Sequence, residues 1–221
     1  VGSEMCIRDR YIGGGCVEGG DYGLTDFGKS LVKEFNNIGM LIDLSHCGPK
    51  VVSDVLELSE KPVTIGHTCC KAVADSPRNK TDEQLKRLKE NGGVVGLTPW
   101  APICWKRKEN VPPTIEDYLD HVCHAVEIVG IDHVGFASDN NLDHASDIAG
   151  IQWQGALFDL IAGVYNKNVG TDPKERHALG FTGVLDIQNL VDGMRRRGFN
   201  NEEIEKFLGG NFLRVIKEVW K

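Results

Sequence analysis

Short apolar runs alternate with amphipathic segments along this chain. Apolar runs that end in polar residues, a pattern typical of buried parallel strands, occupy residues 40–46, 62–67, 94–98 and 134–138. Apolar residues recur at helical spacing in residues 26–37, 49–58, 81–91, 114–129, 183–197, 201–208 and 211–220. This alternation predicts an α/β fold with a parallel sheet and right-handed crossovers, and it gives no sign of a second domain.

The first predicted helix shows the local signals on which these assignments depend. Thr25 is expected to cap its N-terminus, and Gly39 is expected to stop it. The apolar stripe is expected to face the core and consists of Phe27, Leu31, Val32 and Phe35. Residues 99–113 contain several prolines and two tryptophans and are predicted to form a loop.

Three of the four predicted strands end in side chains that can do chemistry. These side chains are His46, His67 and Asp139. Functional groups at the carboxyl ends of successive strands are typical of a (β/α)8 TIM barrel. A complete barrel has eight strands and usually about 250 residues. We therefore expect a partial, metal-dependent amidohydrolase-like barrel from which the N-terminal strands are missing.

The first ten residues, VGSEMCIRDR, differ in kind from the rest of the chain. They have neither the apolar core of a signal peptide nor any helical or strand periodicity. They resemble the translation of a sequencing adapter, so we expect residues 1–10 to be non-native and residues 11–221 to be the C-terminal part of one barrel domain.

Composition excludes several classes of protein. The net charge is −7 and no stripe of Lys and Arg interleaved with aromatic residues occurs, which argues against nucleic acid as a partner. The apolar runs are too short to span a bilayer, so no membrane association is expected. The seven cysteines form no C-x-x-C pair, which suits reduced thiols and a cytoplasmic, bacterial setting.

The strand-end residues are the main candidates for a metal site. His46 and His67 are one β/α unit apart, so adjacent parallel strands would bring them to the same rim, where neutral imidazoles are good zinc ligands. The alternative is a pair of hydrogen-bonded core histidines. Asp139 could bind the metal or accept a proton from metal-bound water, or it could be a turn residue. Arg78, followed by Asn79, suits capture of a carboxylate, although a surface ion pair is the commoner role of an arginine.

The remaining histidines are not expected to bind the metal. His121 and His124 are expected to be solvated on an outer helix, and His133 to be structural. His144 is a candidate substrate contact in the loop after Asp139, and His177 lies in a polar stretch with no assigned role.

Four segments resemble the membrane (renal) dipeptidase family. They are GLTDFGKSLVKEFNNIGMLIDLSHCG (23–48), PVTIGHTCCKAVADSPRNKTDEQL (62–85), IDHVGFASD (131–139) and GGNFLRV (209–215). The resemblance implies a barrel with two zinc ions that cleaves dipeptides with free termini by attack of metal-bound hydroxide. It implies that His46 and His67 bind the second zinc, that Asp139 binds the first zinc and handles the proton, and that Arg78, with Asn79, holds the substrate carboxylate.

The chain departs from the family pattern in ways that affect the expected activity. The His-x-Asp pair, the Glu that bridges the zinc ions and the oxyanion-stabilising His lie upstream in the family and are not found here; Glu18 stands in the wrong context. Asn140 and Asn141 occupy positions where many members have a further acidic residue. We therefore expect a truncated fragment with an incomplete zinc site, inactive on its own, whose open sheet edges favour a homodimer.

Two alternatives remain open from the sequence. One is another amidohydrolase-like hydrolase, such as a lactonase, amidase or deaminase, although the Arg78-Asn79 pair favours the dipeptidase. The other is a non-catalytic barrel without metal.

Overall fold

The centre of the molecule is a small parallel sheet. The computed structural model describes residues 11–16, 22–104, 111–139, 177–181 and 183–221. Its sheet has the order β1 (Thr64–Thr68), β2 (Val94–Leu97), β3 (Val134–Phe136), with both pairings parallel. The predicted α/β class and the parallel sheet are therefore confirmed, and the strands lie within the predicted runs apart from Thr68.

The first predicted strand along the chain, residues 40–46, forms only a single bridge in the structure. Asp43 pairs with Thr64 in parallel fashion, through hydrogen bonds from Leu44 N to Thr64 O (2.9 Å) and from Thr64 N to Ile42 O (2.9 Å). The next donor along β1, the amide of Gly66, bonds to the side chain of Asp43 and not to a main-chain carbonyl. The pairing therefore stops after one bridge, and the prediction of a full strand was wrong for this reason.

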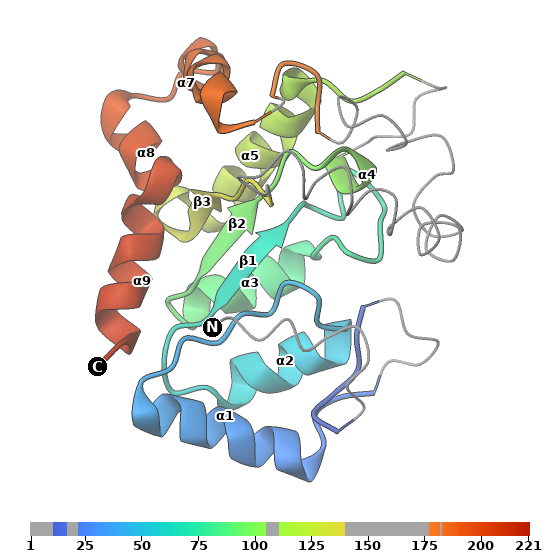
Figure 1. Ribbon diagram of the computed structural model, residues 1–221, viewed down its shortest axis with the longest axis vertical. Helices are drawn as coiled ribbons and strands as arrows, with labels where there is room; N and C mark the ends of the chain where they lie inside the picture. The colour runs from blue at the N-terminus through green and yellow to red at the C-terminus, as the bar shows by residue number, and fades with distance from the viewer. Residues whose placement is uncertain (1–10, 17–21, 105–110, 140–176, 182) are drawn as a thin grey trace.

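Helices cover one face of the sheet. Helices α2 (Pro49–Leu58), α3 (Asp82–Glu90) and α5 (Ile115–Val129) contribute to one continuous apolar core with the sheet, while α1 (Asp26–Ile38) lies next to α2 at the edge of the molecule (Figure 1). Fully buried members of this core from helices and strands are Val52, Ile65, Leu88, Leu97 and Val122.

The opposite face carries small residues where other groups approach closely. Gly96 pairs with Gly135, and a Cβ on Gly96 would lie 2.2 Å from the carbonyl oxygen of Gly66. Phe212, at the start of α9 (Asn211–Val219), lies where a Cβ on Gly135 would be, at 2.6 Å. Helix α9 also joins Val94, at the start of β2, in a second apolar cluster. The strand beginnings are thus closed by the last helix, seen in red in Figure 1.

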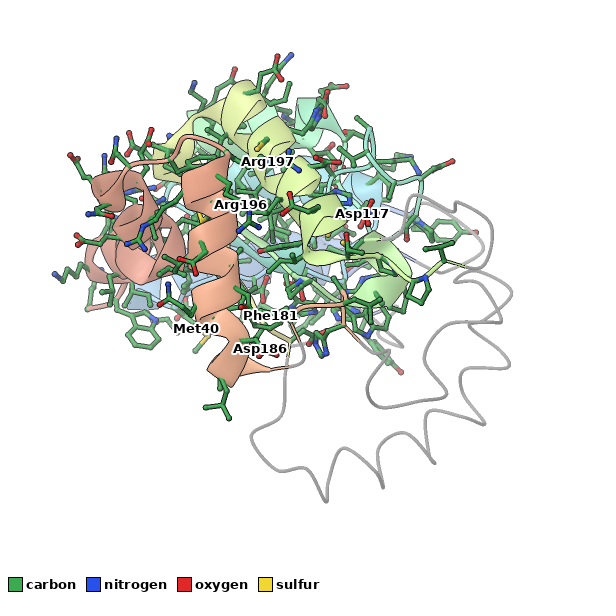
Figure 2. The ribbon with its side chains drawn as sticks, turned by 90° about the horizontal axis from the view of Figure 1, so that it is seen from above. Met40, Asp117, Phe181, Asp186, Arg196 and Arg197 are labelled. Carbon is green, nitrogen blue, oxygen red and sulfur yellow. The ribbon has the colours of Figure 1, made fainter. Side chains whose placement is uncertain are left out.

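Salt bridges join α5 to one of the C-terminal helices. Helix α7 (Ile187–Arg196) follows the 3₁₀ turn η3 (Val184–Asp186). Arg196 pairs with Glu116 at 2.7 Å, and Arg197 pairs with Glu116 at 3.0 Å and Asp120 at 2.8 Å. Both arginines lie between α7 and α5 in Figure 2. The hydrogen bonds from Arg196 and Arg197 hold the pKa of Glu116 below its usual range.

Helix boundaries largely follow the predicted signals. Thr25 and Thr81 cap α1 and α3 with their side chains, and Gly39 ends α1 in a left-handed conformation (φ 74°). The predicted helix 201–208 is α8 (Asn201–Glu205) followed by a π-helical turn, η4 (Lys206–Gly210), and the 3₁₀ turn η1 (Ile131–His133) precedes β3.

Two local predictions were wrong. Phe27 is 61% exposed, because the buried face of α1 passes through Gly28, Val32 and Asn36. Within the predicted loop 99–113, residues Ala101–Cys104 form a helical turn, α4. Thr182, which the sequence predicts to cap the helix 183–197, lies outside the described residues. In the part of the chain that is described, no helix combines the length and apolar character needed to cross a bilayer.

Candidate functional site

The side chains of His46 and His67 lie in contact at the carboxyl end of β1. Their Nε2 atoms are 2.9 Å apart, and the two rings stand edge to face with centroids separated by 4.9 Å. His67 lies within β1, and His46 follows the single bridge at Asp43 by three residues. The predicted convergence of the two imidazoles is confirmed.

Positive charge and burial keep His46 uncharged. Burial, then Arg78, His67 and Lys80, lower the pKa of His46 to about 3. The imidazole therefore carries a free nitrogen lone pair at neutral pH, the state that binds metal ions. Lys80 was not singled out from the sequence, although it is almost fully buried and donates from Nζ to the carbonyl of Cys47 at 3.0 Å.

Arg78 is a buried cation with an open hydrogen-bonding edge. It is 5% exposed, and its Nε and Nη2 atoms have no hydrogen-bond partner among the described residues. These two nitrogens form one side of the guanidinium, the side that grips a carboxylate with two parallel hydrogen bonds. Thr68 Oγ1 donates to the Arg78 carbonyl at 2.9 Å and ties its backbone to the end of β1. Burial excludes the surface ion pair considered from the sequence.

Asn79 fastens the loop that carries Arg78. Its Nδ2 donates to the carbonyls of Ala74 and Ile103, both at 2.8 Å. The side chain is 4% exposed, and its Oδ1 has no partner in the described part of the chain. The amide group therefore joins the loop to α4, while the acceptor oxygen remains open.

Asp139 lies at the end of β3 and apart from the histidine pair. It is exposed and has a left-handed backbone conformation (φ 53°). Strand β2 lies between β1 and β3, and neighbouring strands are about 4.8 Å apart, so the ends of β1 and β3 are separated by roughly 10 Å of sheet. The sequence placed Asp139 beside the histidines; the described residues contain no set of three or more His, Cys, Asp or Glu side chains positioned to hold a metal.

His177 was missed as a structural neighbour of Asp139. It is almost fully buried, and its Nε2 donates to the carbonyl of Ser138 at 3.2 Å, which also accepts from Thr98 Oγ1 at 3.3 Å. Two side chains from distant segments thus hold the residue directly before Asp139. No sequence pattern marked His177, because its contact joins residues that are 39 positions apart.

The histidine pair fits half of a zinc site. Two imidazole nitrogens bound to one zinc would lie roughly 3.3 Å apart, given bonds of about 2.0–2.1 Å and a tetrahedral angle. The observed 2.9 Å is within about 0.4 Å of that value. Zinc in catalytic sites normally takes three protein ligands. The pair therefore suits the metal chemically but supplies only part of its shell.

The other histidines have structural roles where they are described. His121, expected to be solvated, is fully buried; it accepts at Nδ1 from the Cys70 amide (3.1 Å) and lies at Nε2 3.1 Å from the Cys104 carbonyl. The prediction failed because α4 and the segment after β1 cover this side of α5. His133 bonds to the Gly93 carbonyl at 2.8 Å, which confirms its structural assignment, and the half-buried His124 pairs with Asp82 at 2.8 Å. His144, Asn140 and Asn141 lie outside the described residues.

The six described cysteines are free thiols. Burial raises the pKa of Cys70 to about 12 and keeps this thiol protonated. The described cysteines therefore show neither a disulfide nor membership of a metal cluster.

Comparison with known proteins finds dipeptidases and related hydrolases. The dipeptidase tcpJ of Claviceps purpurea is 32% identical over 200 residues, which cover 90% of this chain and 39% of that protein. The structure of an amidohydrolase from Pseudomonas aeruginosa superposes with a TM-score of 0.79 at 33% identity, covering 96% of this chain and 62% of the other. A metallo peptidase from Rhodobacter sphaeroides, liganded with a phosphinate mimic of the dipeptide L-Ala-D-Ala, superposes with a TM-score of 0.69 at 27% identity, covering 90% of this chain and 48% of the other.

The chain spans about two fifths of the length of the curated relatives tcpJ and verJ, a dipeptidase of Clonostachys rogersoniana (39% and 42%). The sequence model of the membrane dipeptidase family, peptidase family M19, matches residues 14–171 and 158–221. Together these two matched regions include every candidate residue of the site. The chain therefore belongs to the membrane dipeptidase family.

Proposed function

We propose that this chain carries part of the active site of a zinc-dependent dipeptidase built on a (β/α)8 barrel. The observation that carries the proposal is the convergence of the His46 and His67 Nε2 atoms, 2.9 Å apart, near a buried arginine with one edge that has no hydrogen-bond partner among the described residues. The parallel order β1-β2-β3, with helices on one face and glycines on the other, supports a segment of barrel wall.

In this proposal His46 and His67 hold one side of a zinc ion. Zinc, when bound, supplies the Lewis acidity that activates water and polarises a peptide carbonyl. The low pKa of His46, about 3, keeps its imidazole available at neutral pH. The remaining ligands would come from outside the described residues, since those contain no third ligand beside the pair.

Arg78 is proposed to bind the free carboxylate of the dipeptide. Its Nε and Nη2 atoms are buried and have no partner in the part of the chain that is described, and a carboxylate with two oxygens would satisfy both. Nearby, the Asn79 Oδ1 atom can accept one further hydrogen bond from the substrate. A buried, unpaired guanidinium is costly, so the site favours an anionic ligand over a neutral one.

Asp139 is proposed to move the proton. As an exposed carboxylate at a strand end, it can accept a proton at a side-chain oxygen from the attacking water and return it to the leaving amine. This role requires the sheet to curve enough to bring the end of β3 toward the end of β1, as closure into a barrel does.

The proposal is tested on the protein in the length in which it occurs in the cell. With zinc supplied, it should hydrolyse dipeptides with free termini, and His46→Ala should abolish that activity. Arg78→Ala should raise KM for free dipeptides by about ten- to a hundredfold, the size of a charge-assisted contact worth roughly 1.5–3 kcal/mol, and should change KM for C-terminally amidated dipeptides much less.

Arg87→Ala is the matched control, because Arg87 donates to the Ser53 carbonyl at 3.1 Å and has no place in the site. An equal loss on free and amidated substrates would remove Arg78 from this role. Absence of any zinc-stimulated dipeptide hydrolysis would overturn the proposed function as a whole.

A further inference from the structure

We propose that Asp43 and Ser45 are positioning residues that set the separation of the His46 and His67 imidazoles. The inference rests on the proposed function for its purpose, since a fixed separation matters when both imidazoles bind one metal ion. Its evidence is a set of hydrogen bonds that joins the two histidine-bearing segments at one carboxylate oxygen.

The first step is the position of the donors. The Ser45 amide donates to Asp43 Oδ1 at 3.0 Å, and the Gly66 amide donates to the same oxygen at 2.7 Å. Ser45 directly precedes His46, and Gly66 directly precedes His67. One oxygen atom therefore fixes the backbone immediately before each imidazole.

The second step is the hydroxyl of Ser45. It donates to Asp43 Oδ1 at 2.6 Å and accepts from the amide of His67 at 3.0 Å. Ser45 is 4% exposed, so water has little access to these bonds. The hydroxyl thus connects the segment that carries His46 to the backbone of His67 itself.

The third step is that these side chains replace a missing part of the sheet. Main-chain pairing between residues 42–44 and β1 stops at Thr64. Beyond that point, the two segments are joined by the hydrogen bonds of Asp43, Ser45 and the imidazole pair. A Cβ on Gly66 would lie 2.5 Å from Asp43 Oδ2, so the carboxylate reaches the strand only because residue 66 has no side chain.

Removing the Ser45 hydroxyl is expected to change the separation of the two imidazoles. Loss of the Ser45 hydroxyl would leave the His67 amide and Asp43 without their shared partner and would let the two segments separate at their tips. Outer partners that orient metal ligands typically change metal affinity by about 10–100-fold when mutated. Asp43 acts through backbone and not as a ligand, since it forms no three-residue metal set with the histidines among the described residues.

The test compares Ser45→Ala with Ser59→Ala in the protein at the length in which it occurs in the cell, as in the test of the proposed function. Ser59 is a matched control because its hydroxyl also joins two segments, donating to the Lys61 carbonyl at 2.8 Å and receiving from Asn36 at 3.1 Å, away from the histidines. The readouts are zinc affinity by competition with a chromophoric chelator, and ¹⁵N chemical shifts of the histidine side chains in zinc-free protein. Thermal unfolding gives the Tm of both variants, so that their effects on zinc binding can be compared at known stability.

We expect Ser45→Ala to shift the His46 and His67 nitrogen signals and to weaken zinc binding by about 10–100-fold, with Ser59→Ala within twofold of wild type in affinity. Ser45→Thr, which keeps the hydroxyl, should restore both readouts. Unchanged nitrogen shifts in Ser45→Ala, or a loss of affinity no larger than in Ser59→Ala, would overturn the positioning role. If wild type binds no zinc, the proposed function fails, and the nitrogen shifts alone decide the positioning role.

Discussion

Replacing Asn79 by alanine should destabilise the protein through two hydrogen bonds that cross from the Arg78 loop to other segments. The Asn79 Nδ2 atom donates to the carbonyls of Ala74 and Ile103, both at 2.8 Å, and Asn79 is only 4% exposed. Each such bond contributes about 0.5–1.5 kcal/mol net, and a buried acceptor left without its donor costs about 1–3 kcal/mol. We therefore expect a loss of about 2–4 kcal/mol in the free energy of unfolding.

For a chain of this size each kcal/mol lowers Tm by roughly 2–4 °C, so Asn79→Ala should melt about 4–16 °C below wild type. The assay is urea unfolding followed by circular dichroism, with a thermal scan as a second measure. Asn37→Ala is the control, since Asn37 is exposed and its 3.5 Å bond to Glu34 is weak; its effect should stay within about 0.5 kcal/mol.

A third variant tests the direction of the bonds. Asn79→Asp places carboxylate oxygens where the two carbonyls require a donor, so at neutral pH it should be less stable than Asn79→Ala. The gap should narrow in acid, because a protonated carboxyl can donate one hydrogen bond. A loss below about 0.5 kcal/mol for Asn79→Ala, or an aspartate variant as stable as wild type at neutral pH, would refute the reasoning.

Two further predictions concern the histidine pair and the last helix. In zinc-free protein the pKa of His46 is about 3, against an ordinary value of 6.5. Between these pH values the unfolded chain binds a proton that the folded chain does not bind. The free energy of unfolding should therefore be unaffected by the titration of His46 above pH 6.5 and should fall by up to about 1.4 kcal/mol per pH unit from pH 6.5 toward pH 3. Urea titrations of wild type and His46→Gln in EDTA should show this difference in slope, and parallel pH profiles would contradict it. Gly135→Ala should cost about 1–3 kcal/mol, because the new Cβ would lie 2.6 Å from Phe212 Cε2. Phe212→Leu in the same chain should recover part of that loss in a double-mutant cycle, whereas strictly additive effects would show that Phe212 is not the obstacle.

The parts of the fold that could be predicted from the sequence depend on short-range signals. Thr81 caps α3 and Gly39 ends α1, because capping involves groups within one turn of the helix. The meeting of His46 and His67 was also predictable, since both follow apolar runs one β/α unit apart and adjacent parallel strands end at one rim.

The parts that could not be predicted depend on how strongly the sheet curves and on which distant segments cover a given side chain. Asp139 forms no three-residue metal set with the histidines among the described residues, and a list of strand ends does not specify how strongly a sheet curves. His121 is buried by α4, which a proline-rich segment gave no reason to expect. Arg78 is buried for a similar reason, because the loop that carries it is fastened inward by Asn79.

The packing of α9 against the strand beginnings has a consequence for synthesis. Val94 packs against Val215, which follows it in the chain by more than a hundred residues. Lys221 Nζ donates a hydrogen bond to the carbonyl of Asn37 at 2.9 Å. At about 5–20 residues per second, a ribosome needs roughly 6–24 s to make the intervening chain. During that interval the start of β2 at Val94 lacks the apolar cover that α9 supplies in the folded protein.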